Sequence, residues 1–338
     1  MSKFMPIVAA AFLVGACHES QIPCWANDEI TPANDSPQHT LKNDSVKLTI
    51  YLPDAEKGYY RGTRFDWSGL IGQAEYKGHT FFGPWKTTHD PKNHDDVDGP
   101  AEEFGMFAPL GYAEAKVGES FIKIGVGRLE KPKEEKYQFY GAYKIVEPGT
   151  WKITHEADWI QFEQDLKDDS GRGYHFVKRI QLAKKGDGFT MDHVLKNTGK
   201  GALETDHYCH NFIRIDDQPI GKDYVVEFAF EPAAKKPLME EAGLKGRRLL
   251  FREDLKPDQA LFVELQGSKE RAEENAVTVK SNKSGAGIRI KGDAPLDHFN
   301  VFAVKLAVCP EPFIKIKLMP GKEMKWTTRY TFFDTKEN

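Results

Sequence analysis

The chain lacks the short motifs that identify several large classes of enzyme. It contains no Gly-x-Ser-x-Gly elbow, which argues against an esterase of the α/β-hydrolase type. It contains no phosphate-binding P-loop, no dinucleotide fingerprint and no His-Glu-x-x-His zinc motif. We therefore expect neither a nucleotide-dependent enzyme nor a zinc protease of the common type.

Excess charge and helical periodicity are also scarce. The 338 residues carry a net charge of −4, with 29% charged and 40% hydrophobic residues, and no basic stripe stands out. This composition is typical of a globular protein, and it predicts no nucleic-acid partner. No long segment repeats its apolar residues with the period of 3.6 that an amphipathic helix requires.

The N-terminus holds an apolar run, at 6–15, which is too short to span a bilayer and follows a weakly basic start. It ends in Val14-Gly-Ala-Cys17, which resembles the lipobox of bacterial lipoproteins. We predict a signal peptide over 1–16, lipidation of Cys17, and export to the bacterial periplasm or cell surface. The lipid would be the only membrane contact. The alternative is an ordinary secretory signal cut near Ala16. Residues 17–43 are polar and predict a tether.

Apolar and polar residues alternate with a period of two over many short segments, often separated by glycine-bearing turns. With no break in composition, they predict an all-β fold: one large sandwich of antiparallel sheets over 44–334. Only two short helical turns are expected, near 101–106 and 237–242. The clearest predicted strands are 46–52, 120–126, 159–164, 174–182, 189–195, 224–230, 260–265, 276–280, 288–290, 300–306, 313–318 and 325–332.

Two stretches late in the chain carry a family resemblance. The first is NTGKGALETDHYCHNF at 197–212. The second is LAVCPEP at 306–312, followed by PGKE at 320–323 and TTRYTF at 327–332. Together they resemble the aldose 1-epimerase (galactose mutarotase-like) superfamily. The resemblance implies a galactose mutarotase-like β-supersandwich, a mono- or oligosaccharide partner, and chemistry that needs no cofactor.

The resemblance also implies a pair of reacting residues, with His210 as general acid and Glu311 as general base. An unperturbed histidine titrates near neutrality, which suits an acid that passes protons across a sugar ring. His207 is the rival, because Thr205-Asp-His207 can also be aligned with the family pattern, but that alignment shortens the preceding turn. We therefore prefer His210 and expect His207 on the opposite face of its strand.

The same alternation of strand faces bears on whether the two cysteines of the predicted domain, Cys209 and Cys309, form a disulfide bond. Side chains on a strand point alternately to its two sides. If His210 and Glu311 share a face, Cys209 points away from that face and Cys309 points toward it. This arrangement argues against a disulfide bond between them.

The candidate sugar-binding residues come from two places. The segment 59–69 contains two arginines, an aspartate and aromatic residues among glycines that predict turns. In the superfamily that the chain resembles, an arginine on an early strand contacts the sugar. We choose Arg64 first and Arg61 second as the sugar-binding residue, because a guanidinium group can donate two hydrogen bonds at once to hydroxyls. Trp67 offers a stacking face. Tyr208 and Asp206 share the strand face of His210. The alternative is a purely structural Arg–Asp pair.

The segment 89–103 carries six acidic residues and one lysine. We predict that it forms a loop too polar to be buried. It could line the mouth of a pocket, or chelate a divalent ion through Asp95, Asp96, Asp98 or Glu102. It lacks the calcium-loop pattern, so we predict no metal site. Such an acidic mouth would repel a sugar phosphate and favours a neutral hexose.

The sequence thus favours an exported aldose 1-epimerase-like protein acting at the anomeric centre of a hexose. Two alternatives stay open. The first is a carbohydrate-binding protein of the same fold without turnover, because a fold does not imply a function. The second is a polysaccharide lyase or hydrolase built on a related sandwich.

Overall fold

The computed structural model describes residues 35–184 and 186–335. The predicted signal peptide, Cys17 and most of the predicted tether lie outside these residues, so export and lipidation stay predictions. The domain boundary needs a correction, because strand β1 (Gln38–Lys42) lies within the predicted tether and pairs with the next strand, β2 (Val46–Tyr51). No helix in the described part of the chain is long and apolar enough to cross a membrane.

The described residues form four antiparallel sheets with almost no helix. The largest has ten strands in the order β16-β17-β14-β19-β20-β23-β12-β11-β10-β9. Their bounds are β9 (Trp151–His155), β10 (Trp159–Lys167), β11 (Gly173–Leu182), β12 (Gly188–Asn197), β14 (Tyr224–Phe228), β16 (Ala242–Lys245), β17 (Arg248–Phe251), β19 (Ala276–Ser281), β20 (Ala286–Gly292) and β23 (Glu323–Asp334).

The second large sheet has six strands in the order β15-β18-β21-β22-β13-β5. Their bounds are β5 (Gly99–Phe104), β13 (Leu203–Phe212), β15 (Ala233–Ala234), β18 (Ala260–Gln266), β21 (His298–Val304) and β22 (Ala307–Leu318). Two smaller sheets complete the fold, one of β1 and β2 with β3 (Leu70–Tyr76) and β4 (His79–Thr80), the other of β6 (Ser120–Lys123), β7 (Gly127–Glu130) and β8 (Ile145–Pro148).

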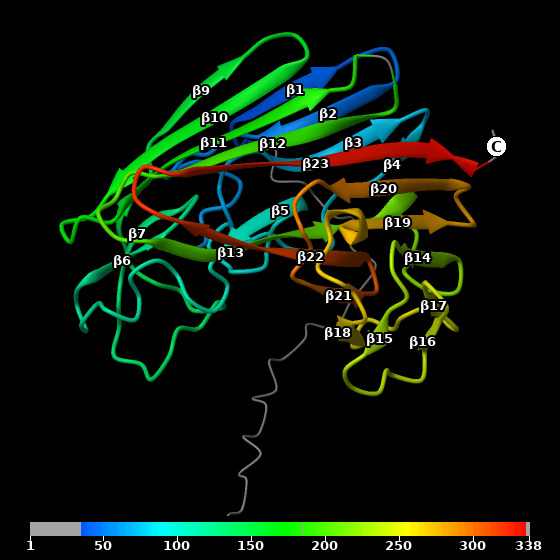
Figure 1. The fold of residues 1–338 in the computed structure, drawn as a ribbon. Coiled ribbons are helices and arrows are strands. Elements are labelled where there is room, and N and C mark those ends of the chain that lie inside the picture. Colours follow the sequence, from blue (N-terminus) through cyan, green and yellow to red (C-terminus); the bar gives the residue numbers. More distant parts are fainter. Residues whose placement is uncertain (1–34, 185, 336–338) are drawn as a thin grey trace, which may run out of the picture.

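The two large sheets lie over one another (Figure 1), which is why the strands alternate between buried and less buried residues. Apolar side chains from both sheets form the main core between them, such as Ile288 and Tyr330 from one sheet and Val301 and Val308 from the other. We call the side of the six-stranded sheet that faces this core its inner face, and the opposite side its outer face.

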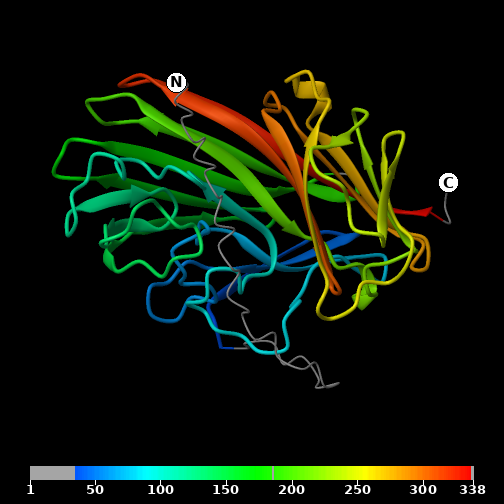
Figure 2. The same cartoon turned by 90° about the horizontal axis from the view of Figure 1, so that it is seen from below.

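A second apolar cluster covers part of the outer face. Phe212, Ala307 and Cys309 of the six-stranded sheet pack there against side chains from segments that precede β9 in the sequence, including Phe65 and Trp85. Figure 2 shows the teal-to-green loops that precede β9 at one end of the molecule and the yellow and orange strands at the other, with cyan segments between them. One end of the outer face is therefore roofed by loops.

Every strand listed from the sequence overlaps a strand of the structure, and the all-β prediction is confirmed. The helical turn expected near 101–106 is wrong, because residues 99–104 form β5. All six residues of β5 are buried, since both faces of this strand are covered, and no period-two pattern marks it. No helix forms at 237–242 either; the described chain has only short 3₁₀ turns, at Ile215–Asp217 and Ala272–Glu274.

Candidate functional site

His210 and Glu311 lie opposite one another on neighbouring strands of the six-stranded sheet. The pairing of β13 with β22 joins Tyr208 to Phe313, and an isolated bridge in the same register joins Ile213 to Val308. This register places His210 across from Glu311, where cross-strand side chains on one face touch. The Nε2 atom of His210 lies 3.0 Å from an Oε1 atom of Glu311.

Aromatic rings enclose this pair. The ring of His210 stacks on Phe212 at a centroid distance of 4.1 Å, and it meets Phe65 and Phe302 edge-on at 5.8 and 5.6 Å. His210 and Glu311 are only 5% and 3% exposed. We expected the two residues to face one shallow cleft within about one sugar ring of each other; they are in contact, but loops cover them where a cleft was expected.

Only one of the two ring nitrogens of His210 has a partner. Its Nε2 atom faces Glu311, whereas its buried Nδ1 atom has no hydrogen-bond partner. An unpaired polar atom in an apolar setting costs free energy that a bound polar group would recover. This leaves one hydrogen-bonding position available beside the pair.

Arg64 belongs to a buried network next to the pair, which we call the outer network: Arg64, Glu103, Lys123 and Tyr208. The Nε atom of Arg64 lies 2.9 Å from Glu103, and its Nη2 atom donates to the hydroxyl of Tyr208 at 2.9 Å. That hydroxyl donates to Glu103 at 2.6 Å, and the Nζ atom of Lys123 lies 2.8 Å from the other Glu103 oxygen. Burial opposes ionisation of Glu103, but Lys123 and Arg64 hold its pKa below the usual value.

Other predicted binding residues have structural contacts of their own. Trp67 is 2% exposed, and its indole N–H donates to the carbonyl of Gly62 at 2.8 Å. Arg61 donates to the backbone carbonyl of Glu56. The carboxylate of Asp206 accepts from the backbone N–H of Met106 at 3.0 Å. Of the predicted sugar-binding residues, only Arg64 and Tyr208 share the buried polar surroundings of the pair.

The inner face of β13 carries the residues that we expected to point away from the pair. His207 lies there, with its Nε2 atom 3.4 Å from Glu102. Cys209 hydrogen-bonds to the amide of Asn211, also within the inner layer. Cys209 and Cys309 are both free, in agreement with the argument from strand faces against a disulfide bond between them.

The prediction that loop 89–103 is too polar to be buried is wrong. Asp96, Asp98, Glu102 and Glu103 are all buried. Asp98 accepts a hydrogen bond from the hydroxyl of Tyr59 at 2.7 Å, and burial nonetheless raises its pKa to about 7. These four acidic residues therefore make contacts inside the protein and do not form a solvated rim around a pocket.

Two residues of the outer network, Glu103 and Lys123, were missed from the sequence. Glu103 was assigned to a polar loop and a helical turn, although Ala101 and Phe104 around it hint at a covered strand. Lys123 was taken as one member of an alternating strand, yet it is 1% exposed. A lysine or glutamate is rarely so buried without a partner, and each is the other's partner.

No family model and no curated protein matches this sequence. Several solved structures match its fold. A protein of Escherichia coli K12, provisionally named an aldose 1-epimerase, aligns with a TM-score of 0.57 and 14% identity over 88% of this chain and 99% of that one. The Slr1438 protein of Synechocystis aligns with a TM-score of 0.55 and 12% identity, covering 92% and 100% of the two chains.

A galactose mutarotase-like protein of Lactobacillus casei aligns with a TM-score of 0.51 and 11% identity, over 88% of this chain and all of that one. At such low sequence identity, the comparisons support a statement about the fold alone. That fold is the one implied by the resemblance of segments 197–212 and 306–312. The chain has the galactose mutarotase-like fold.

Proposed function

We propose that this protein interconverts the anomers of a hexose, with His210 as general acid and Glu311 as general base. The observation that carries the proposal is the contact of these two groups on neighbouring strands, 3.0 Å apart and enclosed by aromatic rings. The fold, which resembles that of proteins named for aldose epimerisation and galactose mutarotation, is consistent with a sugar as the partner.

The spacing of the pair suits the chemistry of an anomeric carbon. The anomeric hydroxyl and the ring oxygen are bonded to the same carbon, so the groups that serve them must lie close together. Glu311 would take the proton of the hydroxyl while His210 protonates the ring oxygen. The ring opens, the bond beside the former anomeric carbon rotates, and closure with the roles reversed gives the other anomer.

The outer network would orient the sugar. Glu103 and Tyr208 hold the Nε and Nη2 atoms of Arg64, which leaves further donors of its guanidinium for a substrate hydroxyl. The roof of aromatic rings keeps bulk water from the pair, which strengthens each electrostatic contact there. A sugar can enter only if His210 and Glu311 separate and the roof opens.

That requirement supports a second candidate, a protein that binds a carbohydrate without turning it over. In this alternative the contact between His210 and Glu311 is a structural ion pair. Sugar would bind farther along the outer face, where Phe302 is paired with the exposed ring of Phe262. The two candidates differ in whether the anomeric centre reaches the pair.

Polarimetry of freshly dissolved α-D-glucose and α-D-galactose separates the two candidates. The proposal predicts that the full-length chain accelerates mutarotation of at least one sugar, and that His210→Gln and Glu311→Gln each lose about 10²–10⁴-fold of this rate. Lys317→Gln is the matched control, because Lys317 is exposed on the same strand as Glu311. Melting temperatures show whether each variant is folded.

A wild-type protein that is stabilised by sugars without accelerating mutarotation supports the binding candidate and contradicts the enzyme. Acceleration that persists in both folded variants would exclude the assigned pair. If oligosaccharides and both hexoses neither react nor raise the melting temperature, both candidates fail.

A further inference from the structure

A second group of chemically active side chains lies on the inner face, between the two large sheets. Glu102 comes from β5, His207 from β13, and His193 from β12 of the facing ten-stranded sheet. These residues are 1%, 4% and 2% exposed. One oxygen of Glu102 and one ring nitrogen of each histidine all lie within 4.8 Å of one another.

The hydrogen bonds of His193 call for a cation beside this ring. Its Nδ1 atom faces the backbone carbonyl of Trp326 at 3.3 Å, and its Nε2 atom faces Glu102 at 2.8 Å. Both neighbours are acceptors, and a neutral imidazole has only one N–H to donate. Either His193 carries a second proton, or a metal ion lies between its Nε2 atom and Glu102.

His207 distinguishes between these two possibilities. Its Nε2 atom is buried 3.4 Å from Glu102 and has no hydrogen-bond partner. A second proton on His193 would satisfy His193 but leave this nitrogen without a partner. One ion among the three residues gives a partner to both imidazoles.

The charges of the surrounding groups also call for a cation. The Nζ atom of Lys178 lies 2.6 Å from Asp66 and 2.7 Å from Glu102, and it donates to the carbonyl of Ser68 at 2.8 Å. Its three N–H donors are thereby occupied. Two buried carboxyl groups share this one ammonium, and burial raises the pKa of Asp66, so a further cation would favour the ionised form of both groups. We call Asp66, Glu102, Lys178, His193 and His207 the inner network.

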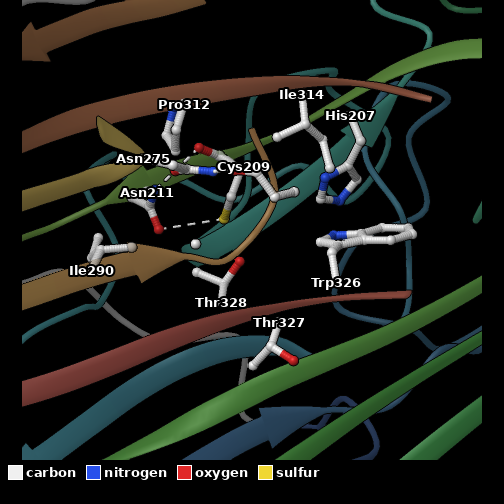
Figure 3. A pocket seen from close by; sticks show the side chains of 12 residues that line it. His207, Cys209, Asn211, Asn275, Ile290, Pro312, Ile314, Trp326, Thr327 and Thr328 are labelled. Atoms are coloured by element: carbon white, nitrogen blue, oxygen red, sulfur yellow. Dashed lines mark hydrogen bonds between the residues drawn. The ribbon is translucent and has the colours of Figure 1, made fainter. Parts of the chain in front are cut away.

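The surroundings match those of metal-binding residues in proteins. A ligating histidine usually donates its other N–H to a carbonyl, as His193 can to Trp326, and a ligating carboxylate is usually hydrogen-bonded, as Glu102 is to Lys178. A cavity of about 20 Å³ adjoins the cluster, with His207 and Trp326 at one end of its lining (Figure 3). That volume is enough for one water molecule.

We propose that Glu102, His193 and His207 bind one divalent transition-metal ion of the zinc class, with a water from the adjoining cavity as a further ligand. Two imidazoles and a carboxylate are a donor set that zinc accepts, and tetrahedral zinc places its ligand atoms about 3.3 Å apart. The separations of 2.8 and 3.4 Å from Glu102 are close to this value, and the two histidine nitrogens, which lie within 4.8 Å of one another, would move closer around the ion. The ion would join β5 and β13 of one sheet to β12 of the other, independently of any sugar chemistry.

The test uses the full-length chain, produced with added zinc and desalted, and then stripped with a chelator and reloaded. Mass spectrometry of its elements should find about one zinc ion per chain. Stripping should lower the melting temperature by a few degrees, because an ion that binds only the folded chain stabilises it, and zinc or cobalt should restore it. X-ray absorption at the zinc edge should show two histidine nitrogens.

His207→Gln should lose the ion, whereas the control His175→Gln should keep it, because His175 is paired with Asp165 near the surface. If His207→Gln does not fold, the stoichiometry and the absorption spectrum of the wild type decide. A folded wild type that holds far less than one ion after exposure to zinc, cobalt, nickel and manganese overturns the proposal and leaves a doubly protonated His193. Retention of the ion by folded His207→Gln overturns it as well.

Discussion

The six-stranded sheet buries a charged network on each of its faces, and neighbouring residues of the same two strands supply both. In β5, Glu103 belongs to the outer network and Glu102 to the inner one. In β13, Tyr208 belongs to the outer network and His207 to the inner one. Because successive side chains of a strand point to opposite faces, one short stretch of sequence serves two separate sets of contacts.

The two networks differ in their balance of charge. On the outer face, two basic side chains, Arg64 and Lys123, contact the single carboxylate Glu103. On the inner face, two carboxylates, Asp66 and Glu102, share the single ammonium of Lys178. A buried group with spare partners tolerates the loss of one, whereas a buried charge that loses its only partner is strongly destabilising.

The buried carboxyl group of Asp98 can be compared with that of Glu103. It is fully buried, like Glu103, but its hydrogen-bond partner is the neutral hydroxyl of Tyr59. Lys123 and Arg64 hold the pKa of Glu103 below its usual value against the effect of burial, whereas burial raises the pKa of Asp98 to about 7. Contact with Lys123 and Arg64 therefore outweighs the effect of burial at Glu103, whereas the hydrogen bond from Tyr59 does not outweigh it at Asp98.

The largest effect is expected from Lys178→Met. Loss of the shared ammonium leaves Asp66 and Glu102 facing each other without it, and we expect the free energy of unfolding to fall by about 3–5 kcal/mol. Urea unfolding followed by fluorescence measures this. The control is Lys47→Met, which removes an exposed ion pair with Glu75 and should change stability by less than about 1 kcal/mol. Equal losses in the two variants would contradict the inner network.

The next effect depends on pH and concerns Asp98→Asn. Because the folded-state pKa of Asp98 is raised to about 7, its protonated form contributes stability that is fully present below the unfolded pKa of about 4 and is lost as the pH rises through about 7. The wild type should lose roughly 2–4 kcal/mol over this window relative to Asp98→Asn, at about 1.4 kcal/mol per pH unit.

Unfolding free energies at about pH 5 and about pH 8 check the sign of this change. Asp169→Asn is the control, because the side chain of Asp169 is fully exposed. The variant at Asp98 should have a flatter pH profile than both the wild type and the control. A wild type that gains stability between the two pH values, relative to Asp98→Asn, would contradict the raised pKa.

The smallest effect on stability is expected from Arg64→Met. Glu103 keeps its contacts with Lys123 and Tyr208, so no buried charge is left alone, and the cost should be roughly 1–2 kcal/mol. If the protein is an epimerase, KM for the sugar should also rise, because Arg64 is the proposed sugar-binding donor. A loss of stability as large as that of Lys178→Met would show that the outer network has no spare cation.

Much of the fold follows from local patterns in the sequence. Alternating segments such as 174–182 and 189–195 predict strands because one side of each is apolar. The same rule fails for β5, Gly99–Phe104, because both of its faces are covered and its carboxylates suggest a surface loop. Two glutamates can lie inside such a strand only because lysines and an arginine reach them from elsewhere in the fold.

The candidate pair was accessible from the sequence, but its surroundings were not. The segments 197–212 and 306–312 singled out His210 and Glu311, and strand parity put His207 on the other face. The roof over the pair includes Phe65, which is nearly 150 positions away from His210 in the chain. No local pattern predicts which distant loop covers a strand.

Local alternation was enough to predict most of the strands, though not β1 or β5, and to predict which neighbours point to opposite sides, because both depend on backbone geometry. Long-range packing brings Glu311 to His210, Arg64 to Glu103, and Lys178 between Asp66 and Glu102. Those contacts depend on the register of strands far apart in the chain and on burial. Burial turns an ordinary ionisable side chain into one whose charge depends on its partner.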